Sequence, residues 1–239
     1  MTLVDAVPER VLAVYAHPDD PEISCGGTLA RWAAAGSAVA VLITTRGEKG
    51  TSDPDADLDA LADLRREETR AAASVLGVAE VHHLDHGDGD LDDTHDLRGE
   101  IVRLVRAFRP EVVLCPDPTA VFFGTSYYNH RDHRVTGFAT LDAVAPAAAN
   151  PHYFPEHRAA GLGVHQVRRV FLSGTLEPDT WVDIGDTLEQ KIDALFCHAS
   201  QLTETGEWFR EFLRASAEEA GRAAGVRYAE SFRRLDLAG

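Results

Sequence analysis

Residues 11–36 read VLAVYAHPDDPEISCGGTLARWAAAG, and the patterns within them predict a strand, a loop and a helix. The apolar run Val11 to Tyr15 is typical of a buried strand, and the Ala-rich run Thr28 to Ala35 is typical of a helix that ends at Gly36. The pair Gly26-Gly27 indicates a turn ahead of that helix. A strand that leads through a loop into a helix is the repeating unit of α/β proteins.

The same alternation continues along the chain and predicts an α/β fold with a mostly parallel sheet. Apolar and β-branched runs predict further strands at 38–45, 81–84, 112–115, 167–175 and 180–184. Amphipathic stretches predict helices at 57–76, 96–108, 188–201 and 208–224. The segment 143–166 has several prolines and glycines but no clear period, and we expect it to form a long loop or lid. With 239 residues, 44% of them hydrophobic, the chain suits a single domain spanning residues 1–239.

The composition argues against several classes of partner. The chain has 39 acidic and 23 basic residues and a formal net charge of -16. We therefore expect no binding to nucleic acid and none to an anionic membrane. The run Val11 to Ala16 is too short for a signal segment or a membrane span, which predicts a cytoplasmic protein. Cys25, Cys115 and Cys197 show no ligand spacing and fit free thiols in a reducing compartment.

Polar residues gather where the expected strands end. Four groups follow strands directly: 17–20, 46–48, 85–90 and Asp117. Because ligands of open parallel sheets bind at the carboxyl ends of the strands, we expect these loops to form one rim. The histidines His82, His83, His86 and His95 lack a regular ligand spacing, and we expect them on loops rather than at a second metal.

Two short motifs, 17–20 (HPDD) and 130–133 (HRDH), together indicate a metal site. Catalytic zinc usually has three protein ligands and one open position, and His17, Asp20 and one of the late histidines, His130 or His133, satisfy that number. Asp19 then remains as a general base for the metal-bound water, whose pKa falls to about 7. Alone, the first motif also suits a turn or a helix cap, and the second suits a solvated helix face. Their presence in one chain favours the metal site.

These motifs resemble those of the PIG-L/LmbE family of zinc-dependent de-N-acetylases. The resemblance covers most of the chain and rests on 16–22 (AHPDDPE) with Gly26-Gly27, 46–50 (RGEKG), 65–68 (RREE), 76–78 (LGV), Asp88-Gly89, Arg109-Pro110, 130–133 (HRDH), 198–201 (HASQ) and 228–232 (YAESF). Pro21 and Arg131 stand where many members have other residues. The resemblance implies a Rossmann-like, three-layer fold of the LmbE type.

Roles for individual residues also come from the resemblance. It implies Zn²⁺ bound by His17, Asp20 and His133, with Asp19 as general base. It also implies that His130, hydrogen-bonded by Asp132, acts on the oxyanion or on the leaving amine. Tyr128 is implied to help polarise the substrate carbonyl. Substrate contacts are implied for Arg65, Asp88 and Arg46, although a solvated helix residue and a plain Asp-Gly turn are simpler interpretations of the first two.

The function implied is hydrolysis of the N-acetyl group of an N-acetylglucosamine-type conjugate, a small molecule. Iron, cobalt or manganese would also suit histidine and carboxylate ligands. Family members often form trimers or hexamers, so a homo-oligomer is expected. The alternatives are a zinc amidase that acts on another N-acyl conjugate, a metal-dependent phosphoesterase, which needs a second set of ligands, and a non-catalytic sugar-binding protein, which has no use for both Asp19 and His130.

Overall fold

The computed structural model describes residues 2–202 and 206–237. Over these residues the strands are β1 (Thr2–Leu3), β2 (Arg10–Tyr15), β3 (Ala38–Thr45), β4 (Glu80–His86), β5 (Val112–Pro116), β6 (Phe122–Phe123), β7 (Tyr127–Tyr128), β8 (Arg169–Ser173), β9 (Thr180–Asp183) and β10 (Ala229–Asp236). The helices are α1 (Asp20–Ala34), α2 (Leu58–Leu76), α3 (His95–Phe108), α4 (Arg131–Asp142), η1 (Ala143–Ala147), α5 (Pro155–Ala159), α6 (Leu188–Leu195), α7 (Ala199–Leu202) and α8 (Gly206–Ala224). None of these helices combines the length and the apolar composition that crossing a membrane requires.

The central sheet is mostly parallel, as the sequence predicted. In the part of the chain that the structure describes it has eight strands, in the order β1-β9-β10-β8-β5-β2-β3-β4. Strands β8, β5, β2, β3 and β4 run parallel to one another, whereas β10 is antiparallel to both of its neighbours. The α/β fold class is therefore confirmed.

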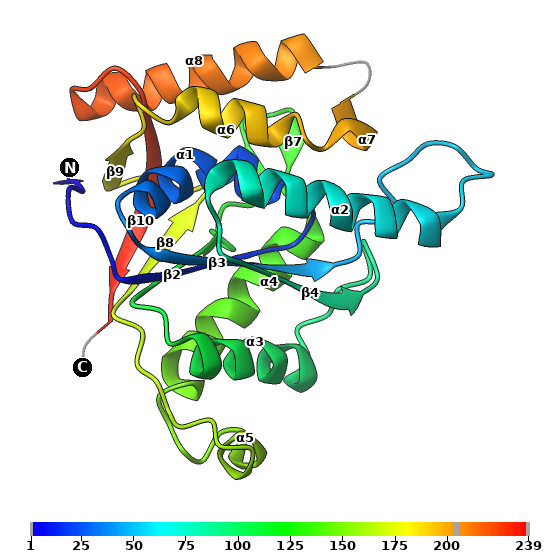
Figure 1. The fold of residues 1–239 in the computed structure, drawn as a ribbon, viewed down its shortest axis with the longest axis vertical. Helices are drawn as coiled ribbons and strands as arrows, with labels where there is room; N and C mark the ends of the chain where they lie inside the picture. Colours follow the sequence, from blue (N-terminus) through cyan, green and yellow to red (C-terminus); the bar gives the residue numbers. More distant parts are fainter. Residues whose placement is uncertain (1, 203–205, 238–239) are drawn as a thin grey trace.

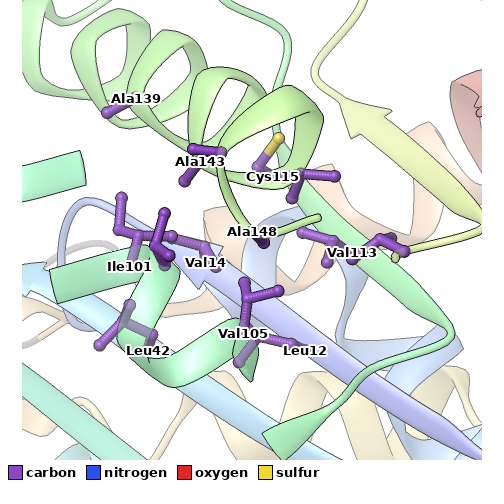
Figure 2. Packing of buried hydrophobic residues seen from close by; sticks show 14 of the residues in the cluster. Leu12, Val14, Leu42, Ile101, Val105, Val113, Cys115, Ala139, Ala143 and Ala148 are labelled. Atoms are coloured by element: carbon purple, nitrogen blue, oxygen red, sulfur yellow. The ribbon is translucent and has the colours of Figure 1, made fainter. Parts of the chain in front are cut away.

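Helices cover both faces of the sheet (Figure 1): α1, α2, α6 and α8 lie over one face, and α3 and α4 over the other. The side chains of β2 alternate between the layers, because successive residues of a strand point to opposite faces. Val11, Ala13 and Tyr15 pack under α1 and α2. Leu12 and Val14 pack against α3 and α4, in the cluster shown in Figure 2. This burial on both faces explains why β2 is a continuous apolar run.

The helix after β2 begins earlier than the sequence suggested. It starts at Asp20 rather than Thr28, and Gly26-Gly27 lie inside it rather than in a turn. Cys25 has non-helical dihedral angles, so the helix changes direction there. A Cβ on Gly27 would come within 2.8 Å of the Ile184 side chain. Close packing, rather than a turn, thus requires glycine at this position.

Other elements differ from the expected pattern in extent. The expected strand 81–84 is longer, and it carries His82, His83 and His86 on β4 rather than on loops. The expected helix 188–201 is two helices, α6 and α7. The antiparallel strand β10 and the short hairpin β6–β7 were not expected, because neither has a long apolar run.

The segment 143–166 contains η1 and α5 and packs along α3, where Phe154 contacts His95 and Gly99 near the start of the helix and Arg106 near its end. The guanidinium of Arg106 donates hydrogen bonds to five backbone carbonyls, those of Ala147, Ala148, Asn150, Tyr153 and Phe154. His165 bonds the carbonyl of Pro110, just before β5 begins. This anchoring suits an ordered loop, and the lid role stays a prediction from the sequence.

Candidate metal centre

A tight turn between β2 and α1 presents the first group of polar residues. The backbone N–H of His17 donates to Oδ2 of Asp20 at 2.8 Å. Asp19 has a left-handed backbone, with φ of 97°, and its side chain makes no cap to the helix. Such a conformation is costly for a residue with a side chain and is concentrated at functional sites. The simple helix-cap interpretation of Asp19 therefore does not hold.

The second group lies at the start of α4. His130 is the residue before the helix, and His133 lies in its first turn. Nε2 of His133 is 3.1 Å from Oδ1 of Asp20 and 3.2 Å from Nδ1 of His17. Ligand atoms of His17, Asp20 and His133 all lie within 4.8 Å of one another. The structure thus brings together two motifs that are more than a hundred residues apart.

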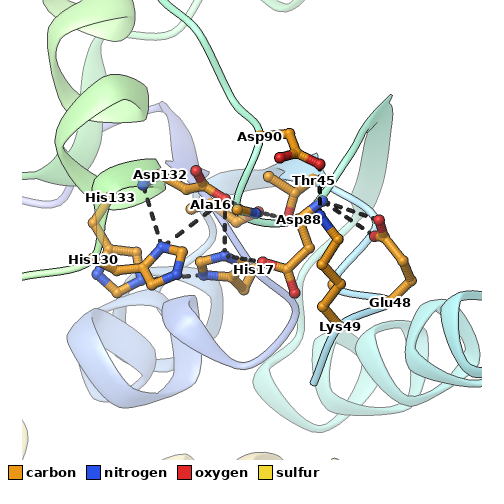
Figure 3. A network of polar contacts seen from close by, with 12 residues as sticks. Ala16, His17, Thr45, Glu48, Lys49, Asp88, Asp90, His130, Asp132 and His133 are labelled. Carbon is orange, nitrogen blue, oxygen red and sulfur yellow. Dashed lines mark hydrogen bonds and ion pairs between the residues drawn. The ribbon is translucent and has the colours of Figure 1, made fainter. Parts of the chain in front are cut away.

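The far sides of both imidazoles are engaged by protein acceptors. Nε2 of His17 lies 3.1 Å from Oδ1 of Asp88, and Nδ1 of His133 lies 3.0 Å from Oδ1 of Asn129. Figure 3 shows His17 between His133 and Asp88. Histidine ligands of metals characteristically donate their other N–H to a carboxylate or carbonyl oxygen. Two ring nitrogens that face each other and a carboxylate suit a divalent cation in chemistry and arrangement.

Asp132 lies closer to His17 than to His130. Its carboxylate is fully buried and accepts the N–H of Gly89 at 2.7 Å. It is 3.4 Å from Nε2 of His17 but 3.9 Å from Nδ1 of His130, which is too long for a hydrogen bond. The contact of His130 with this residue is through the backbone, because Nδ1 of His130 accepts the N–H of Asp132. The ring of His130 remains partly exposed beside His17.

Besides the ligand group His17, Asp20 and His133, the described residues contain a second ligand group, which also includes His17. It consists of His17, Asp88, His130 and Asp132. Because both groups need the same imidazole, and Asp132 already accepts a backbone N–H, they do not form two independent sites. The histidines of β4 and His95 belong to neither group found among the described residues. His198 is fully buried at 3.3 Å from Glu22, under the turn, and belongs to neither group either.

Arg65 is buried against the turn that carries Asp19. Its guanidinium donates to the carbonyl of Pro18 at 2.6 Å, to the carbonyl of Gly47 at 2.7 Å and to Oδ2 of Asp19 at 3.0 Å. Its side chain is only 4% exposed. The simpler interpretation of Arg65 as a solvated helix residue is therefore wrong, and its donors face the protein rather than an open site.

The other residues expected near the substrate have partners of their own. Asp88 is engaged with His17, and it is not a plain turn residue. Arg46 donates to Asp59 on α2. The hydroxyl of Tyr128 accepts a hydrogen bond from Arg134 at 2.5 Å, and the guanidinium of Arg134 also lies over the Tyr128 ring. Asn129 was missed from the sequence, although it is an amide directly beside the second motif.

The charges of the centre follow from burial and close neighbours. Burial by itself lowers the pKa of His17, but hydrogen bonds to surrounding carboxylates, chiefly that of Asp132, raise it well above its ordinary value. Burial would raise the pKa of Asp20, but the adjacent His133 holds it well below the usual range. Burial raises the pKa of Asp19 to about 6 against the lowering effect of Arg65. The centre therefore combines an ionised carboxylate with one that resists ionisation.

Comparison with known families identifies this arrangement. A family model described as "PIG-L: GlcNAc-PI de-N-acetylase" matches residues 12–144, which include the turn after β2 and the first turn of α4. This chain belongs to the PIG-L family. The match includes all three residues of the first ligand group, and the family predicted from the motifs is confirmed.

Individual PIG-L relatives extend the match over nearly the whole chain. A "Diacetylchitobiose deacetylase" of Thermococcus kodakarensis is 38% identical over 226 residues, which cover 94% of this chain and 82% of the relative. A "1D-myo-inositol 2-acetamido-2-deoxy-alpha-D-glucopyranoside deacetylase" of Kineococcus radiotolerans is 34% identical over 69% of this chain, but the match covers only 51% of the relative. The structure of an N,N'-diacetylchitobiose deacetylase from Pyrococcus horikoshii matches with a TM-score of 0.88 and 32% identity, over 96% of this chain and 84% of that one.

Proposed function

We propose that this protein is a metal-dependent hydrolase that removes the N-acetyl group from an N-acetylglucosamine-type conjugate. The observation that carries the proposal is the convergence of His17, Asp20 and His133, with Asp19 on the same turn. The names of the two curated relatives, both deacetylases of acetamido sugars, support the reaction and the substrate class. The diacetylchitobiose deacetylase has the higher identity and coverage, which favours a chitobiose-like disaccharide over an inositol conjugate as substrate.

His17, Asp20 and His133 would hold the cation, and we propose Zn²⁺, with iron, cobalt or manganese as other candidates. A bound zinc ion would polarise the acetyl carbonyl and lower the pKa of a water molecule. Asp88 and Asn129 hold the two imidazoles so that Nδ1 of His17 and Nε2 of His133 face inward. This orientation reduces the reorganisation that binding a cation would need.

Asp19 is proposed to take the proton of the attacking water. Its carboxylate lies on the turn beside Asp20 and is fixed by Arg65 at 3.0 Å. A general base must be close to the proton that it removes and correctly oriented, and such a group typically contributes about 10²–10⁴-fold to the rate. Arg65 acts here as a positioning residue rather than as the sugar contact that the resemblance implies.

His130 is proposed to stabilise the oxyanion and protonate the leaving amine. Its ring lies edge-on to His17, with centroids 4.8 Å apart, and its side chain is 44% exposed, so a substrate can reach it. An amine is a poor leaving group unless it receives a proton, so a positioned acid is needed. Asp132 orients both imidazoles: its carboxylate lies beside Nε2 of His17, and its backbone N–H donates to Nδ1 of His130. Tyr128 would have to leave Arg134 before it could polarise the carbonyl.

The test is mass-spectrometric detection of a free amine. Zinc-loaded protein is incubated with N,N'-diacetylchitobiose, N-acetylglucosamine and an inositol conjugate of N-acetylglucosamine. We expect loss of one acetyl mass with the wild type and none with Asp19→Ala. An absence of product from every acetamido sugar, with the metal shown to be bound, would contradict the proposal and favour a zinc amidase with a different N-acyl substrate.

A phosphoesterase receives less support. Two-metal phosphoesterases need two complete sets of ligands. The two ligand groups found in the described residues share His17. The expected homo-oligomer and the expected cytoplasmic location stay predictions from the sequence.

A further inference from the structure

A cavity of about 810 Å³ adjoins the candidate metal centre. Asp20 and His133 both lie on its wall, so the cavity begins at the proposed ligands themselves. Other parts of the wall come from the first turns of α1, the carboxyl ends of β2, β5 and β8, the hairpin β6–β7 and the start of α8, and Ser24 and Ser126 are among its polar residues. Its large apolar side chains include Ile23, Phe123, Tyr127, Trp208, Phe209 and Phe212. None of the roles proposed above uses this space.

The wall is suited to an apolar group rather than to a sugar ring. Two of its polar residues are already engaged: Asn129 holds His133 and the carbonyl of Ala120, and Ser173 bonds the hydroxyl of Tyr15. The hydroxyl groups of a buried pyranose need hydrogen-bond partners, because an unpaired buried hydroxyl is costly. A ligand made of methylene groups has no such need.

Trp208 and Phe212 of α8 are exposed, whereas Phe209 is partly buried against the cluster that contains Leu213. Trp208 and Phe212 stack with ring centroids 5.3 Å apart, and they are 59% and 43% exposed. The inner face of α8 is buried through small or aliphatic residues further along, Leu213, Ala217 and Gly221. Large aromatic side chains held at a cavity mouth are typical of sites that desolvate an apolar ligand.

The opposite side of His17 is polar. There the loops after β3 and β4 bring Glu48, Lys49, Asp88 and Asp90 together, and the pair formed by Lys49 and Asp90 is exposed (Figure 3). Sugar hydroxyls would find donors and acceptors on this side. The centre therefore separates a polar side from an apolar cavity.

The geometry of the amide that is cleaved indicates which part of the substrate lies on the polar side and which enters the cavity. In a trans amide the group on nitrogen and the group on the carbonyl carbon point in opposite directions. If the sugar, which is attached to nitrogen, lies on the polar side, the acyl substituent enters the cavity. A methyl group is comparable in size to a water molecule, which takes about 30 Å³ of liquid volume. An acetyl group would leave most of the cavity unfilled.

Resting on the proposed N-deacetylation of amino sugars, we propose that this cavity is an acyl-chain site and that the enzyme also removes N-acyl groups longer than acetyl and prefers them. Trp208 and Phe212 are its specificity-determining residues. Each methylene group transferred from water to an apolar site can favour binding by up to about fourfold. The preference should therefore rise with chain length until the cavity is filled.

The experiment compares N-acetyl-, N-butyryl- and N-hexanoylglucosamine as substrates of the zinc-loaded protein, with free glucosamine as the measured product. We expect kcat/KM to rise by about two- to fourfold per added methylene. In Trp208→Ala and Phe212→Ala the ratio of hexanoyl to acetyl turnover should fall towards one. Tyr153→Ala, which removes a similarly exposed aromatic from the far loop, is the matched control and should keep the wild-type ratio.

A binding measurement separates this inference from the proposed reaction. Trp32 and Trp181 are buried, so Trp208 is the exposed indole among the described residues. In the Asp19→Asn protein, N-hexanoylglucosamine should change the fluorescence of Trp208 and bind more tightly than N-acetylglucosamine. Absence of any deacylation, with this binding difference intact, would reject the reaction but retain the acyl site.

Three results would overturn the acyl-chain site. The first is turnover and binding that do not change or that decline as the acyl chain grows. The second is a Trp208-dependent preference for octyl over methyl glycosides of N-acetylglucosamine, with no effect of acyl length, which would make the cavity an aglycone site. The third is a Trp208→Ala protein whose sedimentation shows a smaller oligomer and whose acyl preference is unchanged, which would make the aromatic patch a contact between two copies of the chain.

Discussion

The guanidinium of Arg65 lies 3.0 Å from the carboxylate of Asp19, and it also binds the carbonyl of Pro18 in the same turn. Arg65 comes from the middle of α2, whereas Asp19 precedes α1. A buried cation thus fixes both the backbone and the side chain of the proposed base. The left-handed backbone of Asp19 needs such support, because this conformation is unfavourable for a residue with a Cβ.

Replacement of Arg65 should therefore affect the rate more than substrate binding. In Arg65→Lys we expect kcat for deacetylation to fall by about 10–10³-fold with little change in KM, since misplacement of a general base forfeits part of its contribution. Arg65→Met should be worse and also less stable, by about 3–5 kcal/mol, because it leaves the buried Asp19 without its partner. Arg66→Met, one residue along and paired with the exposed Asp85, is the matched control.

Steady-state kinetics on folded, metal-loaded proteins would decide the role of Arg65. A rise in KM with unchanged kcat in Arg65→Lys would show that the guanidinium contacts substrate, as the family resemblance implies, and not that it positions Asp19. Thermal melts of the same samples would exclude unfolding as the cause of a lower kcat.

The parallel core was predictable because its strands are buried on both faces. The strand 38–45 has the same bounds in the sequence analysis and in the structure, and Gly77 ends α2 with φ of 76°, as its type suggests. Strand β10 was missed because Arg233 and Arg234 break its apolar pattern, although it pairs with both β8 and β9. The helix start at Asp20 was missed because Gly26-Gly27 resemble a turn, whereas Gly27 is required by its tertiary packing against Ile184.

The residues of the centre were predictable, but their contacts were not. Two short motifs with histidine and carboxylate predicted His17 and Asp20 with one of the two late histidines, and the family resemblance implied His133. The fold brings His17, Asp20 and His133 together. Sequence spacing carries no information on which carboxylate faces which ring nitrogen. Asp132 was therefore assigned to His130, although it lies closer to His17, and Asp88 was assigned to the sugar, although it bonds His17.

Asp88 is expected to support metal affinity through His17. The carboxylate accepts from Nε2 of His17 at 3.1 Å, and loss of such a partner typically weakens metal binding by about 10–100-fold. We predict that Asp88→Asn weakens Zn²⁺ binding within that range, measured by competition with a fluorescent chelator. Asp90→Asn, which changes an exposed carboxylate on the same loop, should bind zinc as the wild type does. Unchanged zinc affinity in Asp88→Asn together with a raised KM would instead assign Asp88 to the substrate.

The two overlapping ligand groups make different predictions for the late histidines. If His17, Asp20 and His133 hold the cation, His133→Ala should lose zinc and His130→Ala should retain about one equivalent per chain. Binding to the folded state alone stabilises a protein by about 2.7 kcal/mol at a ligand concentration a hundred times Kd. Zinc should therefore raise the Tm of the wild type and of His130→Ala, but not that of His133→Ala. Elemental analysis after dialysis measures the same difference directly, and loss of zinc from His130→Ala alone would favour the second group.

The absence of a side chain at Gly27 allows α1 to pack closely against Ile184. A Cβ on Gly27 would lie 2.8 Å from both Cβ and Cγ2 of Ile184, and the backbone N–H of Gly27 donates to Glu230 at 3.0 Å. Overpacking of this kind typically costs about 1–3 kcal/mol, so Gly27→Ala should lower the Tm. Gly163→Ala, where a Cβ would meet nothing within 4 Å, is the matched control and should leave the Tm nearly unchanged.

A second substitution separates the steric clash from loss of backbone freedom. Ile184→Ala removes the atoms that a Cβ on Gly27 would meet, so the double variant should lose less stability than the sum of the two single variants. Contacting residues typically show such coupling at about 0.5–3 kcal/mol. Strictly additive losses in urea denaturation would mean that Ile184 is not what excludes a side chain at Gly27.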